Sequence, residues 1–258
     1  MNRRACLTLG IGWLASSSCD RPEHRGRIKA IVGALAIDPG GETFPNSVVL
    51  VSSSHIQRVG SSMDVSIPSG AERWDVKDRF IIPAPVELGR GVIMPKMDSL
   101  AEANLVLIRT PEAVEGIVGD TDELPAALVR SLAAADTIVT PRLARLEQSP
   151  AKLERGLRHI KTLLDVRVRL ASFAGPDAAA EWRLMARAGM TPKQVLESAT
   201  FHAARVARQQ DDAGSLRVGS RANLWVLRRN PLTSADNLTG VDSIMLEGVW
   251  QRNPGVPN

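Results

Sequence analysis

Short apolar runs separated by turn signals make up the chain from about residue 30 onward. Such runs occur at 32–37, 47–52 and 56–59, and a further run lies at 80–82. The sequence Asp38-Pro39-Gly40-Gly41 is typical of a tight turn. This pattern predicts a β-meander with short loops.

Longer segments with a helical spacing of apolar residues follow in the middle of the chain. The spacing predicts helices over 99–108, 123–135, 150–164, 177–188 and 192–208, with short strands at 137–140 and 166–173. Thr191 is expected as the N-cap of the last helix, with Pro192 at its first position. Helices that alternate with strands indicate βα units on a parallel sheet.

Strand signals return near the C-terminal end, at 222–227 and 243–250. The expected fold class is therefore α/β, with strands at both ends and βα units between them. We expect the end segments 30–80 and 213–252 to pair into one small β-sandwich, a composite domain, and 81–212 to form the βα part.

Residues 1–19 have the pattern of an export signal. Arg3 and Arg4 precede an apolar stretch, 5–15, which is too short to span a bilayer but suits a signal peptide. The charged segment 20–29 is expected to be a linker.

Cys19 follows three serines and resembles the acylation site of bacterial lipoproteins, although Ser16 stands where leucine is usual. We therefore expect an exported protein of the cell envelope, a periplasmic lipoprotein, attached to the membrane only through a lipidated Cys19. An ordinary secreted protein and an uncleaved anchor are the alternatives. Cys6 is the only other cysteine, so the mature part can hold no internal disulfide.

The amino-acid composition argues against a disordered chain and against a nucleic-acid partner. Hydrophobic residues make up 44% and charged residues 23% of the chain, as in ordinary globular proteins, which argues against disorder throughout. The net charge is +4, and two of the basic residues, Arg3 and Arg4, lie in the export signal. Because the other bases alternate with acids, no nucleic-acid partner is expected.

Two sets of short phrases carry a family resemblance. The first segment has the Gly-rich turn 38–41 and the phrase Ile56-Gln57-Arg58-Val59-Gly60. The last segment has the stronger set: Met190-Thr191-Pro192, Ser198-Ala199-Thr200, Gly214-Ser215-Leu216, Gly219, Ala222-Asn223-Leu224 and Asn230-Pro231-Leu232. In order and spacing these phrases resemble the amidohydrolase superfamily, in particular its imidazolonepropionase-like and prolidase-like hydrolases.

The resemblance implies a (β/α)8 barrel that holds zinc or another divalent metal, which lowers the pKa of a bound water for attack on an amide or ester carbon. The segment 84–212 is about half as long as a full barrel of roughly 250 residues. We therefore expect a truncated, partial TIM-like barrel. Because an open barrel leaves unpaired strand edges, a homodimer is the expected assembly.

The positions where the resemblance implies metal ligands carry other residues. Gly89 and Gly91 stand in the family's Asp-x-His-x-His phrase, Val118 stands for a later histidine, and Phe173 stands for the aspartate that acts as general base. Another histidine position aligns loosely near Pro95 or Lys96. Imidazole and carboxylate groups are the ligands such a site needs. We therefore expect no catalytic residue, no bound metal and no cofactor.

Few other side chains could rebuild a metal site. The remaining candidates are His24, His55, His159, His202, Asp120, Asp122, Glu123 and Glu87. We expect surface or packing roles for the histidines, a solvated turn and helix N-terminus for the three acids at 120–123, and a structural role for Glu87. The serines at 52–54 and 61–62 are expected in turns.

Three function hypotheses follow. The first is an amidohydrolase by ancestry that is non-catalytic and serves as a binding or scaffold protein. The second is a hydrolase of carbon–nitrogen bonds, in dipeptides or non-peptide substrates, or of ester bonds, that uses an atypical site. The third is the product of a decaying gene without a selected activity. The replaced ligand positions favour the first.

Overall fold

The structure is a computed structural model that describes residues 27–87, 113–115, 118–119, 121–135, 137–252 and 254. Several features expected from the sequence lie outside these residues: the export signal 1–19 with Cys19, residues 20–26 of the linker with His24, the helix 99–108, and Gly89, Gly91, Pro95, Lys96 and Asp120. In the described part, no helix is long and apolar enough to cross a membrane.

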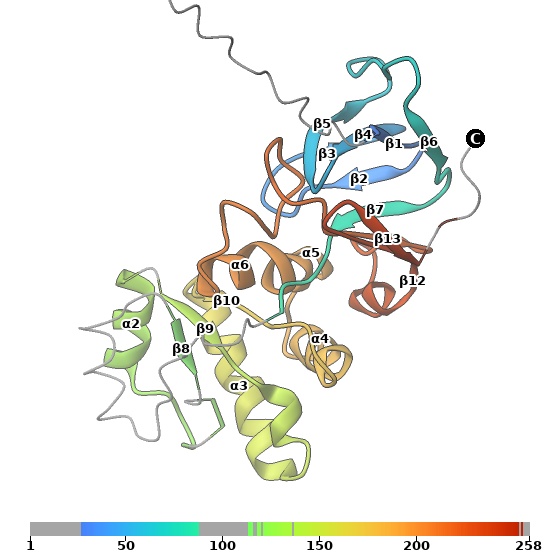
Figure 1. Ribbon diagram of the computed structural model, residues 1–258. Coiled ribbons are helices and arrows are strands. Elements are labelled where there is room, and N and C mark those ends of the chain that lie inside the picture. The colour runs from blue at the N-terminus through green and yellow to red at the C-terminus, as the bar shows by residue number, and fades with distance from the viewer. Residues whose placement is uncertain are drawn as a thin grey trace, which may run out of the picture.

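Strands from both ends of the chain form two sheets, at the upper right of Figure 1. The four-stranded sheet has the order β5-β4-β1-β6, with β1 at Lys29–Val32, β4 at Ser47–Ser52, β5 at His55–Ser61 and β6 at Glu72–Asp75. The six-stranded sheet has the order β13-β12-β11-β7-β2-β3, with β2 at Leu35–Ile37, β3 at Thr43–Phe44, β7 at Phe80–Pro83, β11 at Leu224–Leu227, β12 at Val241–Leu246 and β13 at Val249–Arg252.

The prediction of one strand over 32–37 was wrong. Gly33 has φ +91° and separates β1 from β2, which lie in different sheets. A Cβ at Gly33 would come within 3.2 Å of Asp75 Oδ1 and 3.3 Å of Lys77 Cα, so both the space and the backbone angle favour glycine there. The chain thus changes sheets inside a run that is apolar throughout.

The single strand predicted over 243–250 was also wrong. β12 and β13 pair antiparallel there and are joined at Glu247 and Gly248, which have φ +48° and +75°. Two consecutive residues with positive φ are typical of the tight hairpin turns that match the twist of paired strands. Strand β6 had no counterpart in the prediction, and it pairs parallel with β1.

A shared hydrophobic core lies between the two sheets. Ile31, Val49 and Val51 contribute from the four-stranded sheet, and Leu224 and Met245 contribute from the six-stranded sheet. The rings of Trp74 and Trp250, which belong to different sheets, lie 5.6 Å apart. Each large side chain buried in this way stabilises the fold by about 1.5–3 kcal/mol relative to exposure.

The middle of the chain forms a parallel three-stranded sheet with helices, at the lower left of Figure 1. The strand order is β10-β9-β8, with β8 at Ala113–Glu115, β9 at Ile138–Thr140 and β10 at Arg169–Leu170. The helices are α2 at Ala126–Ala134, α3 at Pro150–Asp165 and α4 at Ala178–Arg187, with a 3₁₀ turn, η1, at Leu143–Leu146. The mixed α/β class is confirmed, but in the described residues no sheet closes into a barrel.

The helix that begins after Thr191 has the predicted cap. The Thr191 hydroxyl accepts a hydrogen bond from Gln194 N at 3.3 Å, and Gln194 Oε1 accepts one from Thr191 N at 2.8 Å. The predicted helix 192–208 consists of three pieces: α5 at Pro192–Glu197, a π-helical turn η2 at Ser198–His202 and α6 at Ala203–Val206. A short 3₁₀ helix, η3 at Ala235–Thr239, precedes β12.

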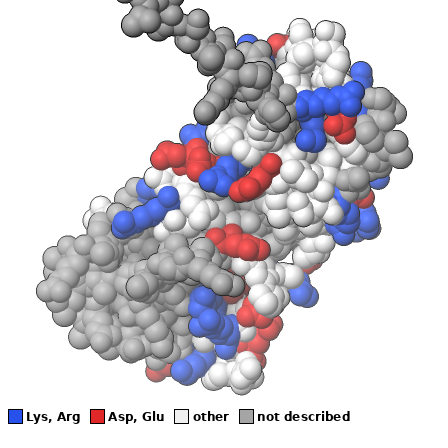
Figure 2. Space-filling model, viewed as in Figure 1, with Lys and Arg blue, Asp and Glu red and all other residues white. Residues whose placement is uncertain are grey.

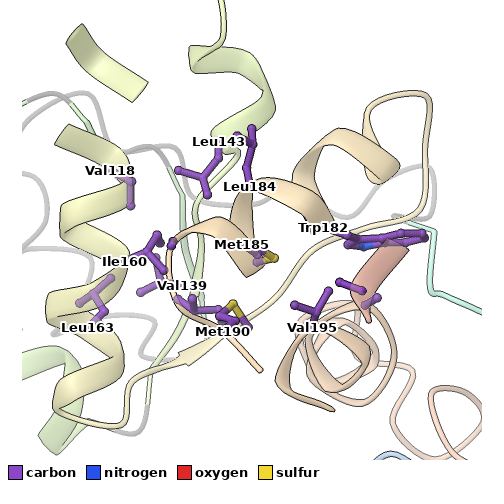
Figure 3. Packing of buried hydrophobic residues seen from close by; sticks show 14 of the residues in the cluster. Val118, Val139, Leu143, Ile160, Leu163, Trp182, Leu184, Met185, Met190 and Val195 are labelled. Carbon is purple, nitrogen blue, oxygen red and sulfur yellow. The ribbon is translucent and has the colours of Figure 1, made fainter. Parts of the chain in front are cut away.

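One continuous core joins the helices to the parallel sheet. Figure 3 shows Ile160 and Leu163 of α3 beside Val139 of β9, with Met185 of α4 on the other side. The apolar face predicted for 150–164 is the buried face of α3. The predicted strand 166–173 is much shorter than expected, because only Arg169–Leu170 pairs with β9.

The hairpin turn at Gly248 provides a stability test. A Cβ at Gly248 would overlap the carbonyl oxygen of Ser53, whereas a Cβ at Gly219, which also has positive φ, would meet nothing within 4 Å. We expect Gly219→Ala to cost only the backbone strain, about 1–2 kcal/mol. Gly248→Ala should cost at least about 3 kcal/mol, because the strand pair must also move. Urea unfolding of both variants measures the difference, and equal losses would contradict the close contact between the β12–β13 turn and Ser53.

Candidate ligand-binding site

A pocket of about 460 Å³ opens at the carboxyl ends of the parallel strands. Thr140 is the last residue of β9, and Ser172 and Phe173 come two and three residues after the end of β10. The described residues of the lining are Glu87, Thr140, Arg142, Ala144, Arg145, Ser172, Phe173, Ala174, Gly175, Pro176, Asp177, Ala178 and Glu181. Ligands of α/β proteins usually bind at this end of the strands, so the pocket is the candidate site.

The structure brings together two positions that the sequence singled out, Glu87 and Phe173. Glu87 forms a parallel bridge with Ala174, and Ala174 N donates a hydrogen bond to Val86 O at 2.9 Å. The segment after β7 therefore lies along the segment after β10. Glu87 is exposed at the pocket, and the half-buried ring of Phe173 packs against Val86.

Val118 lies away from the pocket. Its side chain is 3% exposed and belongs to the core around α3. Figure 3 shows it beside that helix, on the side of Leu143 and Ile160. This position therefore contributes apolar packing, and a polar side chain there would have to be buried.

His159 is a buried link between α3 and the turn that contains Val118. Gly119 N donates a hydrogen bond to His159 Nδ1 at 3.1 Å, so Nδ1 carries no proton and the ring has its proton on Nε2. That group faces the carbonyl oxygen of Asp122 at 3.4 Å. Arg155, one turn earlier, donates to Gly119 O at 3.2 Å. These contacts give His159 the packing role expected from the sequence.

The other two described histidines also contact their neighbours locally. His202 Nδ1 donates to the carbonyl oxygen of Leu170 at 2.9 Å, which ties η2 to β10. His55 Nδ1 lies 2.9 Å from the Ser54 hydroxyl, and His55 forms a bridge with Arg221 in the strand-rich part.

The donor set needed for a divalent metal does not occur in the described part of the chain. No group of three or more histidine, cysteine, aspartate or glutamate side chains lies together there. Asp122 is 95% exposed and lies 3.7 Å from Arg155, and Glu123 lies just before α2. The described residues thus do not fit the metal that the resemblance implies, and no hydrolytic step is derived through it.

Glu181 is a buried acid at the pocket that was not predicted from the sequence. Its side chain is 7% exposed, and its Oε2 accepts a hydrogen bond from Ala144 N at 2.7 Å, at the start of η1. Its Oε1 has no hydrogen-bond partner in the described residues. A signal was present, because Ala178, Leu184 and Met185, three or four residues away, are apolar and predict a buried helix face.

Burial raises the pKa of Glu181 above its usual value of 4.5, since desolvation disfavours the charged form. Backbone N–H groups of Ala144, Leu143 and Arg142, and the charge of Arg142, act in the opposite direction and do not cancel it. Thr140 Oγ1 is a second buried oxygen of the pocket lining without a partner in the described part.

The remaining polar groups complete the pocket. Ser172 Oγ, also buried, accepts a hydrogen bond from Trp182 Nε1 at 3.0 Å. Arg142 has φ +52°, an uncommon conformation for a residue with a side chain, and it places the start of η1 at the pocket. Arg145 and Asp177 are exposed members of the lining. Among the described residues on the face drawn in Figure 2, basic and acidic side chains are mixed, without a broad patch of one sign.

His159→Phe tests the buried link to the 118–122 turn. The change keeps a ring of similar size but leaves Gly119 N buried without an acceptor, which should lower the free energy of unfolding by about 1–3 kcal/mol. Arg158→Ala, an exposed neighbour on α3, should stay within about 0.5 kcal/mol of the wild type. Denaturant unfolding measures both. Equal stability of His159→Phe and wild type would contradict the assigned hydrogen bond.

Glu181→Gln tests the state of the buried acid. Because the pKa is raised on folding, the folded chain binds this proton more tightly than the unfolded chain. The resulting stability is complete below pH 4.5 and is lost as the pH rises through the raised pKa. Glutamine does not titrate. The free energy of unfolding of the variant should therefore rise relative to that of the wild type between about pH 4 and about pH 7. Paired unfolding curves at both pH values measure this gain, and a difference that is the same at both would contradict the raised pKa.

Comparison with known proteins identifies the origin of this architecture. The model of a family described as "Amidohydrolase family" matches residues 118–250, just over half of the chain. No curated protein matches the sequence.

Solved structures share the fold at low sequence identity. The molinate hydrolase structure has a TM-score of 0.66 and 12% identity, covering 88% of this chain and 95% of that chain. Ochratoxinase of A. niger has a TM-score of 0.66 and 13% identity, covering 90% and 97%. Phenylurea hydrolase B has a TM-score of 0.67 and 14% identity, covering 87% and 96%. At these identities the likeness shows the fold alone.

Proposed function

The chain belongs to the amidohydrolase family, and from this premise we propose that it is a non-catalytic member that binds a small molecule in the pocket at the carboxyl ends of β9 and β10. The observation that carries the proposal is Phe173. It lines the pocket at the position where the family resemblance implies the aspartate that acts as general base. A phenyl ring can neither hold a metal nor accept a proton, but it can form the wall of a binding site.

Two further observations support binding without hydrolysis. The position that corresponds to a histidine ligand, Val118, contributes to the apolar core instead of the pocket. The pocket nevertheless keeps a volume of about 460 Å³ and buried polar groups at Thr140, Ser172 and Glu181. This combination of apolar wall and few polar groups is typical of small-molecule sites.

The proposal extends to the place and assembly of the protein. We propose that the chain is an exported envelope lipoprotein, acylated at Cys19, and that its parallel strands derive from a truncated TIM-like barrel. A homodimer would protect the open edges of such a sheet.

A second candidate function is hydrolysis of a carbon–nitrogen or ester bond at an atypical site. The observation in its favour is the buried carboxyl of Glu181, whose raised pKa suits a general acid or base. Glu87, exposed at the same pocket, would be the second carboxyl group of such a site.

Metal analysis and a substrate panel distinguish the two candidates. The purified mature chain should contain well under about 0.1 equivalents of zinc or manganese and should not hydrolyse dipeptides or lactones above background. Stoichiometric metal with turnover that is lost on chelation would overturn the proposal. Turnover that survives chelation but falls by about a hundredfold or more in Glu181→Gln would support the second candidate.

A further inference from the structure

We propose that the pocket selects a small primary amine, with its ammonium head held by Glu181 Oε1 and Thr140 Oγ1 and its apolar tail against Phe173. This inference rests on the proposed binding function and names the class of ligand.

In the described part of the lining, two buried oxygens lack a hydrogen-bond partner, and each can accept a hydrogen bond. Glu181 Oε1 is a carboxyl oxygen and Thr140 Oγ1 is a hydroxyl oxygen, and both are shielded from solvent. Leaving such a group buried without a partner destabilises the protein, so binding of a ligand that supplies donors is favoured. A primary ammonium carries three N–H donors and no acceptor, which matches two oxygens of the same pocket lining.

The neighbouring polar groups already accept hydrogen bonds from the protein, so the two unpartnered oxygens are the proposed contacts for the ligand head. Glu181 Oε2 is already occupied by Ala144 N, and Ser172 Oγ already accepts from Trp182 Nε1. The first contact holds α4 to η1, and the second holds the segment after β10 to α4. These contacts fix the surroundings of the two oxygens, and because both oxygens are buried, the lining must open slightly for a ligand head to reach them.

The burial of Glu181 is the reason for proposing a positively charged head group on the ligand. An ionised carboxylate is costly to bury unless a cation lies beside it. Arg142 acts on Glu181 from the loop before η1, but it does not offset the desolvation. An ammonium group at Oε1 supplies the missing charge more completely than a neutral amide or alcohol.

The other lining residues are the reason for proposing an apolar tail on the ligand. Phe173, Ala174, Pro176 and Ala178 form an apolar wall from the loop after β10 to the start of α4. The exposed acids Glu87 and Asp177 favour approach of a cation, and Arg145 is the exposed base of the lining. A short branched or aromatic tail fits this wall within about 460 Å³.

The experiment uses three matched probes of one carbon skeleton with the mature chain: 3-methylbutylamine, 3-methylbutanol and 3-methylbutanoate. Titration calorimetry or ligand-observed NMR at neutral pH should show the amine binding at least about tenfold more tightly than the alcohol, with the carboxylate weakest. Glu181→Gln should weaken binding of the amine by at least about tenfold, and Thr140→Val should weaken it by about threefold or more. Glu197→Gln, a half-buried acid on α5 beside Lys193 and outside the pocket lining, is the matched control and should bind as wild type does.

Two further measurements separate recognition from folding. Glutamine can still accept from Ala144 N while it presents an N–H₂ group in place of Oε1, so Glu181→Gln should prefer the alcohol over the amine. In the wild type, amine affinity should fall with falling pH as Glu181 takes up its proton, and this dependence should be absent in the variant. The charged groups that face Glu181 or the pocket mouth and contribute to the profile are Arg142, Arg145, Glu87 and Asp177.

Each outcome decides the proposal. Equal or tighter binding of the alcohol or the carboxylate overturns the amine assignment, although the binding function would stand. The absence of binding by all three probes also overturns it, and bound metal with chelation-sensitive turnover would overturn the proposed function separately. If Glu181→Gln does not fold, as judged by circular dichroism, Thr140→Val and the pH profile of the wild type decide the result.

Discussion

The antiparallel pairing of β7 with β11 is the contact on which the remaining structure depends. It joins Ile81 to Val226 and Ile82 to Trp225, and so it fastens the C-terminal strands to the N-terminal half of the chain. The same line of backbone hydrogen bonds continues beyond the sheet, because Ala84 N donates to Asn223 O and Val86 N donates to Ala199 O. Next along the line, Ala174 N donates to Val86 O, which places Glu87 beside the loop after β10. The pocket is thus positioned by the pairing of the chain ends. Any displacement of β7 would also displace Glu87 and the loop after β10, and so would change the pocket.

Much of the fold could be predicted from the sequence where the pattern is local. The 3–4 spacing of leucine and isoleucine in 150–164 gave the buried face of α3, and the Thr191-Pro192 pair gave the start of α5. Both signals depend on helix geometry within one or two turns, which needs no knowledge of distant residues. The strand signals were less informative, because an apolar run does not say which sheet it joins. The run 32–37 divides between two sheets at Gly33, and only the approach of Asp75 and Lys77 makes the division necessary.

The candidate site was predictable only where it depends on local sequence. Phe173 and Glu87 could be named because short phrases around them resemble a family pattern, and both line the pocket. Glu181 was missed because a single acid in a helix normally faces solvent, and its burial depends on η1, about 37 residues earlier in the chain. The left-handed conformation of Arg142, which places η1 there, has no marker in the sequence, since glycine or asparagine would be usual.

The proposed non-catalytic binding function agrees with the different energetics at Val118 and at the pocket. At Val118 the side chain adds to a core with Leu143, Leu153 and Leu157, so a polar side chain there would lose packing and would bury an unpaired group. At the pocket the opposite holds, because Glu181 and Thr140 keep buried oxygens that destabilise the empty fold. Because both oxygens belong to the pocket lining, a ligand that supplies donors would remove this cost, which is the physical argument for the proposed binding function.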